Sequence, residues 1–253
     1  MLRSFADGKL MGDTFGSRAP TVLALHGWAR SRRDFSAVMA PAGSDPIDAI
    51  ALDLPGFGAS PPPPAPWGST EYAELVAEVF VEMDPPVILL GHSLGGRVAV
   101  ALAAANPEAV AGVVLTGVPL RRPTLRRPGT PLAFRMGRVL NRHGLVSDAA
   151  MESLRNRYGS TDYKAAQGVM RQVLVRLVNE QYEEMIAAIR CPAALIWGSD
   201  DVVAPPTVAQ DVLGEFTDAH LTLLPGVGHL TPSVAPAALH DAVIDMLRAR
   251  HTR

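Results

Sequence analysis

Short apolar runs alternate with helical patterns along most of the chain. Six runs are almost continuous in apolar residues before they reach a glycine, serine or aspartate: "TVLALHG", "IDAIALDLPG", "VILLGHS", "VAGVVLTGV", "AALIWGSD" and "HLTLLPGVGH". Such runs are typical of strands that are covered on both faces, as in a parallel sheet. The segments between them have helical patterns, at roughly residues 31–40, 69–83, 94–106, 206–216 and 236–250. This alternation predicts an α/β fold with a mostly parallel, doubly wound sheet.

The alternation stops between residues 120 and 189, where no good strand pattern is found. Apolar residues recur there at helical spacing, at Val169, Met170, Val173, Leu174, Leu177 and Val178. Such a spacing predicts helices with one apolar face. We therefore expect a helical insertion at 120–189 in a core formed by residues 1–119 and 190–253. An insertion of this kind often covers a site.

One tract is of low complexity, "SPPPPAPWGS" at residues 60–69. Four consecutive prolines favour a stiff polyproline II conformation. The tract is expected to be a rigid connection on the surface. The alternative is that it forms a wall of the entrance to a site.

Composition limits the classes of function. The chain has 253 residues, of which 48% are hydrophobic and 19% charged, and a formal net charge of −2. This balance can fill one large core, and it gives no reason to expect nucleic acid as a partner. The single cysteine, Cys191, excludes an internal disulfide framework and a cysteine-rich metal site, and is expected to be a buried thiol. Neither a signal peptide nor an apolar run of about 20 residues is found, so we expect a cytoplasmic protein with no membrane span.

The motif "GHSLGG" is the strongest indication of chemistry. It matches the G-x-S-x-G pattern of a nucleophile elbow, and it lies between a strand pattern and a helix pattern. The small neighbours allow a sharp turn that exposes the hydroxyl next to a helix N-terminus, which favours negative charge. Ser93 is therefore predicted to be a nucleophile.

A serine hydroxyl needs a base and an acid to activate it. Among the seven histidines, only His229 follows the last strand pattern, in "LPGVGHLTP". Its loop is expected at the same sheet edge as Ser93. The preceding strand is followed by "WGSDDVVAPP", where Asp201 is the preferred acid and Asp200 the alternative. The chain order Ser, Asp, His is the order given for α/β-hydrolases.

An acyl-transfer reaction also needs donors for the oxyanion. The backbone N–H of Leu94, which follows the nucleophile, is predicted to be one. The other is predicted to be the backbone N–H of Trp28, in the turn "LHGWARS" after the first strong strand. The Trp28 side chain would then lie at the acyl pocket.

With these residues placed, the sequence resembles the α/β-hydrolase fold superfamily over essentially its whole length. The segments "LHGW", "ALDLPGFGAS", "GHSLGGRVA", "IWGSDDVVAP" and "PGVGHLTP" come in the order and spacing of that superfamily. The resemblance implies that Ser93, Asp201 and His229 form a catalytic triad and that the insertion is a helical cap. It also implies that Asp53, in "DLPGFG", is structural.

The resemblance implies several chemistries, because this fold carries many. We expect a serine hydrolase that cleaves a small to medium carboxylic ester or thioester through an acyl-enzyme, with no metal or organic cofactor. The alternatives are a C–C hydrolase, a lyase or a perhydrolase with the same triad, or a ligand-binding relative without turnover. Ser93 argues against the dehalogenase and epoxide hydrolase branches, which carry aspartate there. Esterases of pimeloyl-carrier-protein methyl ester commonly have tryptophan where this chain has His92, so their substrate is not transferred.

The expected cap has an uneven distribution of charge. Between residues 120 and 147 there is no acidic residue, but there are seven arginines: Arg121, Arg122, Arg126, Arg127, Arg135, Arg138 and Arg142. They form either a solvated surface or an electropositive cap that attracts an anionic or carrier-bound acyl substrate. A weaker alternative is contact of the basic, partly amphipathic segment with a membrane surface.

Overall fold

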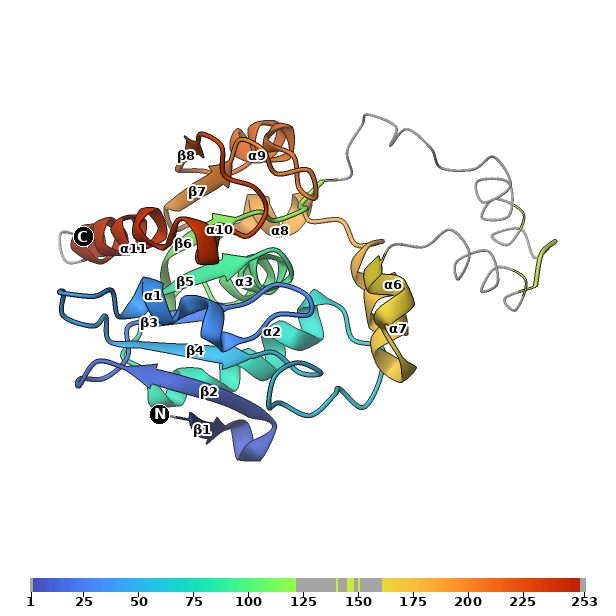
Figure 1. Ribbon diagram of the computed structural model, residues 1–253, viewed down its shortest axis with the longest axis horizontal. Helices are drawn as coiled ribbons and strands as arrows, with labels where there is room; N and C mark the ends of the chain where they lie inside the picture. The colour runs from blue at the N-terminus through green and yellow to red at the C-terminus, as the bar shows by residue number, and fades with distance from the viewer. Residues whose placement is uncertain (1, 122–139, 141–144, 148–149, 151–160, 251–253) are drawn as a thin grey trace.

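The computed structural model describes residues 2–121, 140, 145–147, 150 and 161–250, and its centre is one eight-stranded sheet (Figure 1). The strands lie in the order β1-β2-β4-β3-β5-β6-β7-β8. Their bounds are Leu2–Phe5, Leu10–Phe15, Val22–Leu25, Ala49–Asp53, Val87–His92, Val110–Thr116, Ala193–Gly198 and Ala219–Leu224 for β1 to β8. All pairs from β4 to β8 are parallel, whereas β1–β2 and β2–β4 are antiparallel. The predicted α/β fold with a mostly parallel sheet is confirmed.

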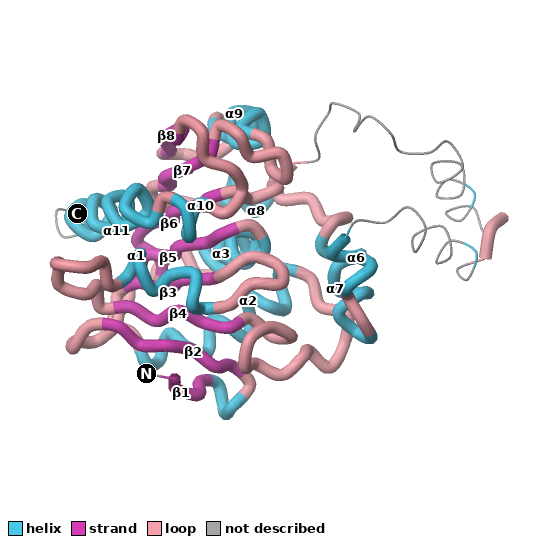
Figure 2. Tube along the Cα trace, in the orientation of Figure 1, coloured by secondary structure: helices cyan, strands magenta, loops and turns pink. Residues whose placement is uncertain are grey.

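Helices cover both faces of the sheet, as the apolar runs predicted (Figures 1 and 2). On one face, α1 (Ser36–Met39) and α11 (Pro236–Arg250) pack with side chains such as Leu90 and Ile196 in one core. On the other, α2 (Ser69–Ala77), α3 (Leu94–Ala105), α8 (Glu183–Ala188) and α9 (Pro206–Leu213) form the larger core. Every residue of β3, β4, β5 and β7 is buried, whereas the edge strand β8 is partly exposed.

Strands β1 and β2 were not predicted. They form an antiparallel hairpin at the edge of the sheet. Only Phe5 in β1 is buried, so this strand has no apolar run. The turn carried the signal that was overlooked. Asp7 and Gly8 both have positive φ, 53° and 82°, and an Asp-Gly pair between short strands is a known hairpin indication.

The predicted helices are found, with three differences. Residues 31–40 form a 3₁₀ turn, Arg32–Phe35, before the short α1, and α2 continues as a second 3₁₀ turn, Glu78–Glu82. An additional short helix, α10 (Thr231–Val234), lies between β8 and α11. Within the described residues, no helix combines the length and the apolar character needed to cross a lipid bilayer.

Only part of the predicted insertion lies within the described residues, and that part is helical. It forms α6 (Thr161–Ala165), α7 (Gly168–Leu177) and α8, with a break before Gly168, whose φ is +52°. Helices α6 and α7 lie beyond the carboxyl ends of the parallel strands (Figure 1). Of the seven arginines only Arg121 is described, and it forms ion pairs with Glu215 and Glu183. The other six arginines lie outside the described residues.

One smaller expectation needs correction. Cys191 is partly buried, not buried, because it lies in the turn before β7 begins. The proline tract is an irregular connection, and Pro61 to Pro64 line a hollow of about 530 Å³ with Trp67 and Glu71. None of the three predicted triad residues lines that hollow.

Candidate active site

Ser93 lies at the turn between β5 and α3, in a strained backbone conformation. Its φ and ψ are 51° and −111°, a region that costs a non-glycine residue about 1–3 kcal/mol. The Ser93 N–H donates to the carbonyl of Thr116 on β6 at 3.0 Å, and the Ser93 carbonyl accepts from Gly96 and Arg97. These bonds hold the strained turn, and the hydroxyl is raised at the carboxyl edge of the sheet.

The glycines around Ser93 are required by close packing of the backbone. A Cβ added to Gly91 would lie 2.4 Å from the Gly96 Cα, and one added to Gly95 would lie 2.0 Å from the Leu25 carbonyl oxygen. Strand β5, helix α3 and the end of β3 therefore meet with no room for side chains. This contact explains the small residues in "GHSLGG" by geometry.

The structure brings Ser93, Asp201 and His229 together. The His229 Nδ1 lies 2.7 Å from the Asp201 Oδ2, and the His229 Nε2 lies 3.2 Å from the Ser93 Oγ. Asp201 is buried, and its Oδ1 accepts from the amides of Val203 and Ala204, each at 2.8 Å. A carboxylate held in this way selects the His229 tautomer with hydrogen on Nδ1. The Nε2 lone pair then accepts from the serine hydroxyl.

The alternative acid, Asp200, does not join this group. Asp200 is exposed, and its Oδ1 accepts from the hydroxyl of the neighbouring Ser199 at 2.7 Å. The turn after β7 directs the two adjacent aspartates differently, and the structure pairs Asp201 with His229.

The two amides that sequence reasoning proposed as oxyanion donors lie on adjoining backbone segments. The Gly95 N–H donates to the His26 carbonyl at 2.9 Å, so the turn after β3 runs along the first turn of α3. A Cβ added to Gly27 would lie 3.3 Å from the Ser93 Cβ. Within the described part of the chain, the N–H groups of Trp28 and Leu94 donate to no backbone or side-chain acceptor. Neither amide is therefore engaged by another acceptor among these residues, and their role as oxyanion donors stays a prediction.

The Trp28 side chain packs edge-on against Phe57, with ring centroids 4.9 Å apart. The loop that carries Phe57 also touches α7, because a Cβ on Gly56 would lie 2.3 Å from the Met170 sulfur. Trp28, Phe57 and Met170 are thus partly buried apolar side chains of one packed region. They come from the turn after β3, the loop after β4 and α7.

His92, which was set aside among the seven histidines as a candidate base and marked a departure from the pimeloyl esterases, contacts His229 directly. Its Nε2 lies 2.9 Å from the main-chain oxygen of His229, and the two ring centroids are 4.9 Å apart. The side chain is 1% exposed. Burial, and then the proximity of His229, lower the pKa of His92 to about 4. No signal in a single sequence could indicate this contact between residues so far apart in the chain.

His26 and Asp53 hold the neighbouring loops. The His26 Nδ1 bonds to the Gly27 carbonyl, and its Nε2 accepts from the Leu54 N–H at 3.0 Å, while burial lowers the pKa of His26. Asp53 is fully buried and accepts from the backbone N–H groups of Arg32 and Ala59, each at 2.8 Å, and from the Arg32 guanidinium. Both side chains have their partners within the loops that they join, which agrees with a structural role for Asp53.

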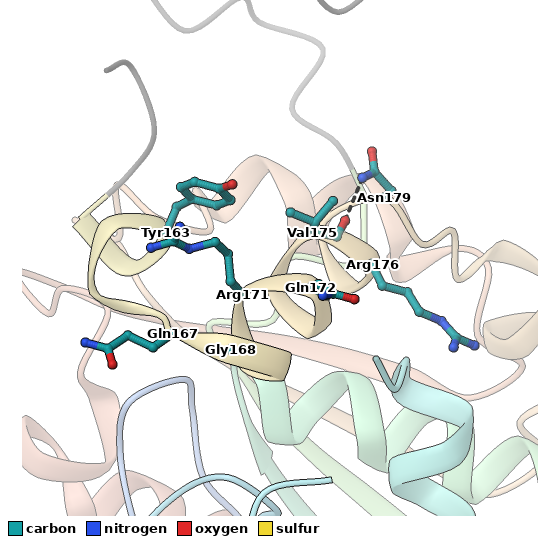
Figure 3. A pocket seen from close by; sticks show the side chains of 8 residues that line it. All are labelled: Tyr163, Gln167, Gly168, Arg171, Gln172, Val175, Arg176 and Asn179. Carbon is teal, nitrogen blue, oxygen red and sulfur yellow. Dashed lines mark hydrogen bonds between the residues drawn. The ribbon is translucent and has the colours of Figure 1, made fainter. Parts of the chain in front are cut away.

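A hollow of about 510 Å³ lies on α6 and α7, apart from these residues (Figure 3). It is lined mainly by polar side chains, and the Arg171 guanidinium lies 5.2 Å from the centre of the Tyr163 ring. No residue of the Ser93 group lines it. Among the described residues, no group of three or more histidine, cysteine or acidic side chains is placed to hold a metal ion.

Comparison with known proteins agrees with this geometry. A family model described as "Alpha/beta hydrolase family" matches residues 22–242, a range that includes Trp28, Ser93, Asp201 and His229.

Two curated relatives match over nearly the whole chain. A 2-hydroxy-6-oxononadienedioate/2-hydroxy-6-oxononatrienedioate hydrolase of Cupriavidus pinatubonensis is 28% identical, covering 92% of this chain and 88% of the relative. A pimeloyl-[acyl-carrier protein] methyl ester esterase of Chromobacterium violaceum is also 28% identical, covering 95% and 96%. Among solved structures, a thermophilic esterase from Thermogutta terrifontis superposes with a TM-score of 0.70 at 21% identity, covering 99% of each chain. The structural match shows the same fold.

Proposed function

Because the chain belongs to the alpha/beta hydrolase family, we propose that it is a serine hydrolase that cleaves a carboxylic ester or thioester through an acyl-enzyme. The observation that carries the proposal is the chain of two hydrogen bonds from Asp201 through His229 to Ser93, at 2.7 and 3.2 Å. A base oriented by a carboxylate and within reach of a strained, raised hydroxyl is the arrangement that activates a serine.

In the first half of the reaction, the Ser93 oxygen attacks the substrate carbonyl carbon and His229 Nε2 takes the hydroxyl proton. The carbonyl oxygen becomes an oxyanion, which the amides of Trp28 and Leu94 bind. Donors aimed at the developing charge are worth several kcal/mol in such reactions. The tetrahedral intermediate then collapses: the bond to the leaving oxygen or sulfur breaks, and the imidazolium of His229 returns the proton to that atom.

In the second half, water replaces the leaving group. His229 accepts a proton from the water, whose oxygen attacks the acyl carbon, and the same two amides hold the oxyanion again. The bond from the acyl carbon to Ser93 breaks, the serine oxygen takes the proton back, and a carboxylic acid leaves. Asp201 orients the ring and stabilises the imidazolium in both halves.

The partly buried apolar side chains near the amide of Trp28 support an acyl group of small to medium size. Trp28 and Phe57 present aromatic surface, and Met170 adds an adaptable thioether from α7. Arg121, whose charge is compensated by Glu215 and Glu183, does not serve an anionic substrate in this proposal.

A second candidate is hydrolysis of a carbon–carbon bond by the same three residues. The relative from Cupriavidus pinatubonensis, named for dienedioate substrates, is as similar to this chain as the methyl ester esterase is. The two candidates share the nucleophile and the base, and they differ in the leaving atom, which is carbon in the second.

The test is steady-state hydrolysis of p-nitrophenyl esters from acetate to palmitate. Wild type is expected to turn over short and medium esters with an optimum chain length, and Ser93→Ala is expected to lose this activity. Ser44→Ala is the matched control, because Ser44 is exposed in the loop before β4, at the opposite edge of the sheet. Folded wild type that hydrolyses no ester of the series, but does hydrolyse a 2-hydroxy-6-oxo-dienoic acid, would favour the second candidate.

A further inference from the structure

The loop that carries His229 is bonded to the nucleophile turn by a second contact besides the Ser93 hydroxyl. His92 is the residue directly before Ser93, and its ring nitrogen Nε2 lies 2.9 Å from the main-chain oxygen of His229. The backbone segments of the nucleophile and of the base are therefore joined by one side chain. The two residues are 137 positions apart in the chain.

The hydrogen bond fixes the state of the His92 ring. A carbonyl oxygen only accepts, so the Nε2 of His92 must carry the hydrogen and donate it. The Nδ1 is buried, and it has no hydrogen-bond partner among the described residues. A proton on Nδ1 would be a buried donor without an acceptor, which is costly, so the ring is held as the neutral Nε2–H form.

The surroundings of the ring agree with this state. The Nδ1 side faces Gly27, where a Cβ would lie 2.8 Å from Nδ1 and 3.0 Å from Cε1. Burial and the neighbouring His229 ring both oppose protonation, whereas the carboxylates of Asp34 and Asp201 favour it, and the net effect is the lowered pKa of His92. The ring is thus enclosed by the turn after β3 on one side and by the base on the other.

We propose that His92 is a positioning residue, which holds the main chain of His229 through its Nε2–H and so sets the distance from the His229 ring to Ser93. Asp201 bonds the ring of His229 and not its main chain. The bond from His92 fixes the backbone of the same residue to the rigid end of β5. This role rests on the proposed function, in which His229 is the base. It assigns a positioning role to His92, a side chain that does not touch substrate.

The consequence is a selective loss of rate. A misplacement of about 1 Å in a catalytic group costs about 100-fold in rate. Loss of the bond from His92 is therefore expected to lower kcat and to leave KM nearly unchanged, because the surfaces that bind substrate are not altered.

Three substitutions separate the hydrogen bond from packing. His92→Gln places an amide N–H at about the distance of Nε2 from the backbone, His92→Met fills the same space without a donor, and His92→Asn carries a donor that is too short. We expect kcat to fall by about 10- to 100-fold in the methionine and asparagine variants and to return to within about 3-fold of wild type in the glutamine variant. Thermal unfolding verifies that each variant is folded.

The labelling rate of Ser93 by a fluorophosphonate probe distinguishes the two proposals. If wild type is not labelled, the proposed function fails. If wild type is labelled and His92→Met reacts at the same rate, or if glutamine is no better than methionine, the role of His92 is contradicted.

The protonation state of the His92 ring is tested in wild type, independently of the variants. Nitrogen-15 NMR of the histidine rings is expected to show His92 with hydrogen on Nε2 and a bare Nδ1 from pH 5 to 9, assigned by the signal lost in His92→Gln or by through-bond correlation to the His92 backbone. A His92 ring that titrates in this range, or that carries its hydrogen on Nδ1, would overturn the inference.

Discussion

Gly117, at the carboxyl end of β6, lies directly against the pair formed by His229 and Asp201. A Cβ at this position would lie 3.0 Å from the His229 Nδ1 and 3.2 Å from the Asp201 Oδ2, and the φ of Gly117 is +60°. The backbone just after β6 therefore packs directly against the hydrogen bond between Asp201 and His229.

Gly117→Ala is expected to lower kcat by at least about 10-fold, because the methyl group presses on the bond that orients His229. Gly43→Ala is the matched control. Gly43 also has a positive φ, +82°, but nothing lies within 4 Å of its added Cβ, so the control shares the backbone strain without the contact. Equal kcat values in the two variants would show that the contact with His229 does not matter.

The adjacent aspartates provide a second matched pair. Asp201→Asn keeps the shape but removes the acceptor that selects the His229 tautomer, and kcat is expected to fall by about 10³- to 10⁴-fold. Asp200→Asn, whose carboxylate bonds among the described residues to the Ser199 hydroxyl, is expected to stay within about 2-fold of wild type. Steady-state kinetics with the best p-nitrophenyl ester measures both, and the reverse order would assign the acid to Asp200.

The pH dependence of stability follows from the buried His92. Burial lowers its pKa to about 4 in the folded protein, from the ordinary value of 6.5 that the unfolded chain approaches. As the pH falls below 6.5 the unfolded chain takes up a proton that the folded chain does not, so the free energy of unfolding decreases until about pH 4. The contribution of His92 to this decrease is at most about 3 kcal/mol.

Urea unfolding from pH 7 to pH 4 measures this contribution as the difference between wild type and His92→Gln. The other titrating groups are common to both proteins, and the variant is expected to lose less stability than wild type. Parallel curves for the two proteins would contradict the lowered pKa of His92.

Arg97 joins α3 to the end of α7 and to the segment just before the insertion. Its guanidinium donates to the carbonyl of Leu177 at the end of α7, at 2.8 Å, and to the carbonyl of Pro119, just before the insertion, at 3.0 Å. Arg97→Met leaves both carbonyls without this donor, which is expected to lower the free energy of local opening of α7 by about 1–3 kcal/mol.

Hydrogen exchange measures this effect at the amides of α7, which should exchange about 10- to 100-fold faster in Arg97→Met. Arg248→Met is the control, because the Arg248 side chain is 76% exposed and, among the residues that the structure describes, pairs with its helix neighbour Asp245. Unchanged exchange in α7 would show that other contacts hold the helix.

The central strands and their connecting helices were predictable because a local pattern of apolar residues indicates each of them. The strands at the centre of the sheet are buried on both faces, so their apolar runs are continuous. The hairpin of β1 and β2 was missed because it lies at the edge of the sheet. Few of its apolar side chains are buried there, mainly Phe5 and Leu10, so neither strand has a continuous apolar run.

The placement of Ser93, Asp201 and His229 followed from topology, because the carboxyl ends of parallel strands share one edge. The contacts around them did not follow. The bond from His92 to His229 and the approach of Gly117 depend on how loops from β5, β6 and β8 meet in space, and no local pattern encodes such a meeting. The choice between Asp200 and Asp201 likewise needed the turn after β7.

The proposed function requires that Ser93 forms a covalent acyl-enzyme with His229 as its base. The most direct measurement is the intact mass of the protein, quenched within the first turnovers with p-nitrophenyl acetate, for wild type, Ser93→Ala and the control Ser44→Ala. We expect wild type and Ser44→Ala to gain the mass of one acetyl group, which a proteolytic digest then locates on the peptide that contains Ser93, and we expect Ser93→Ala to gain none. An acetyl group on another residue, or ester turnover that persists in Ser93→Ala, would contradict the account.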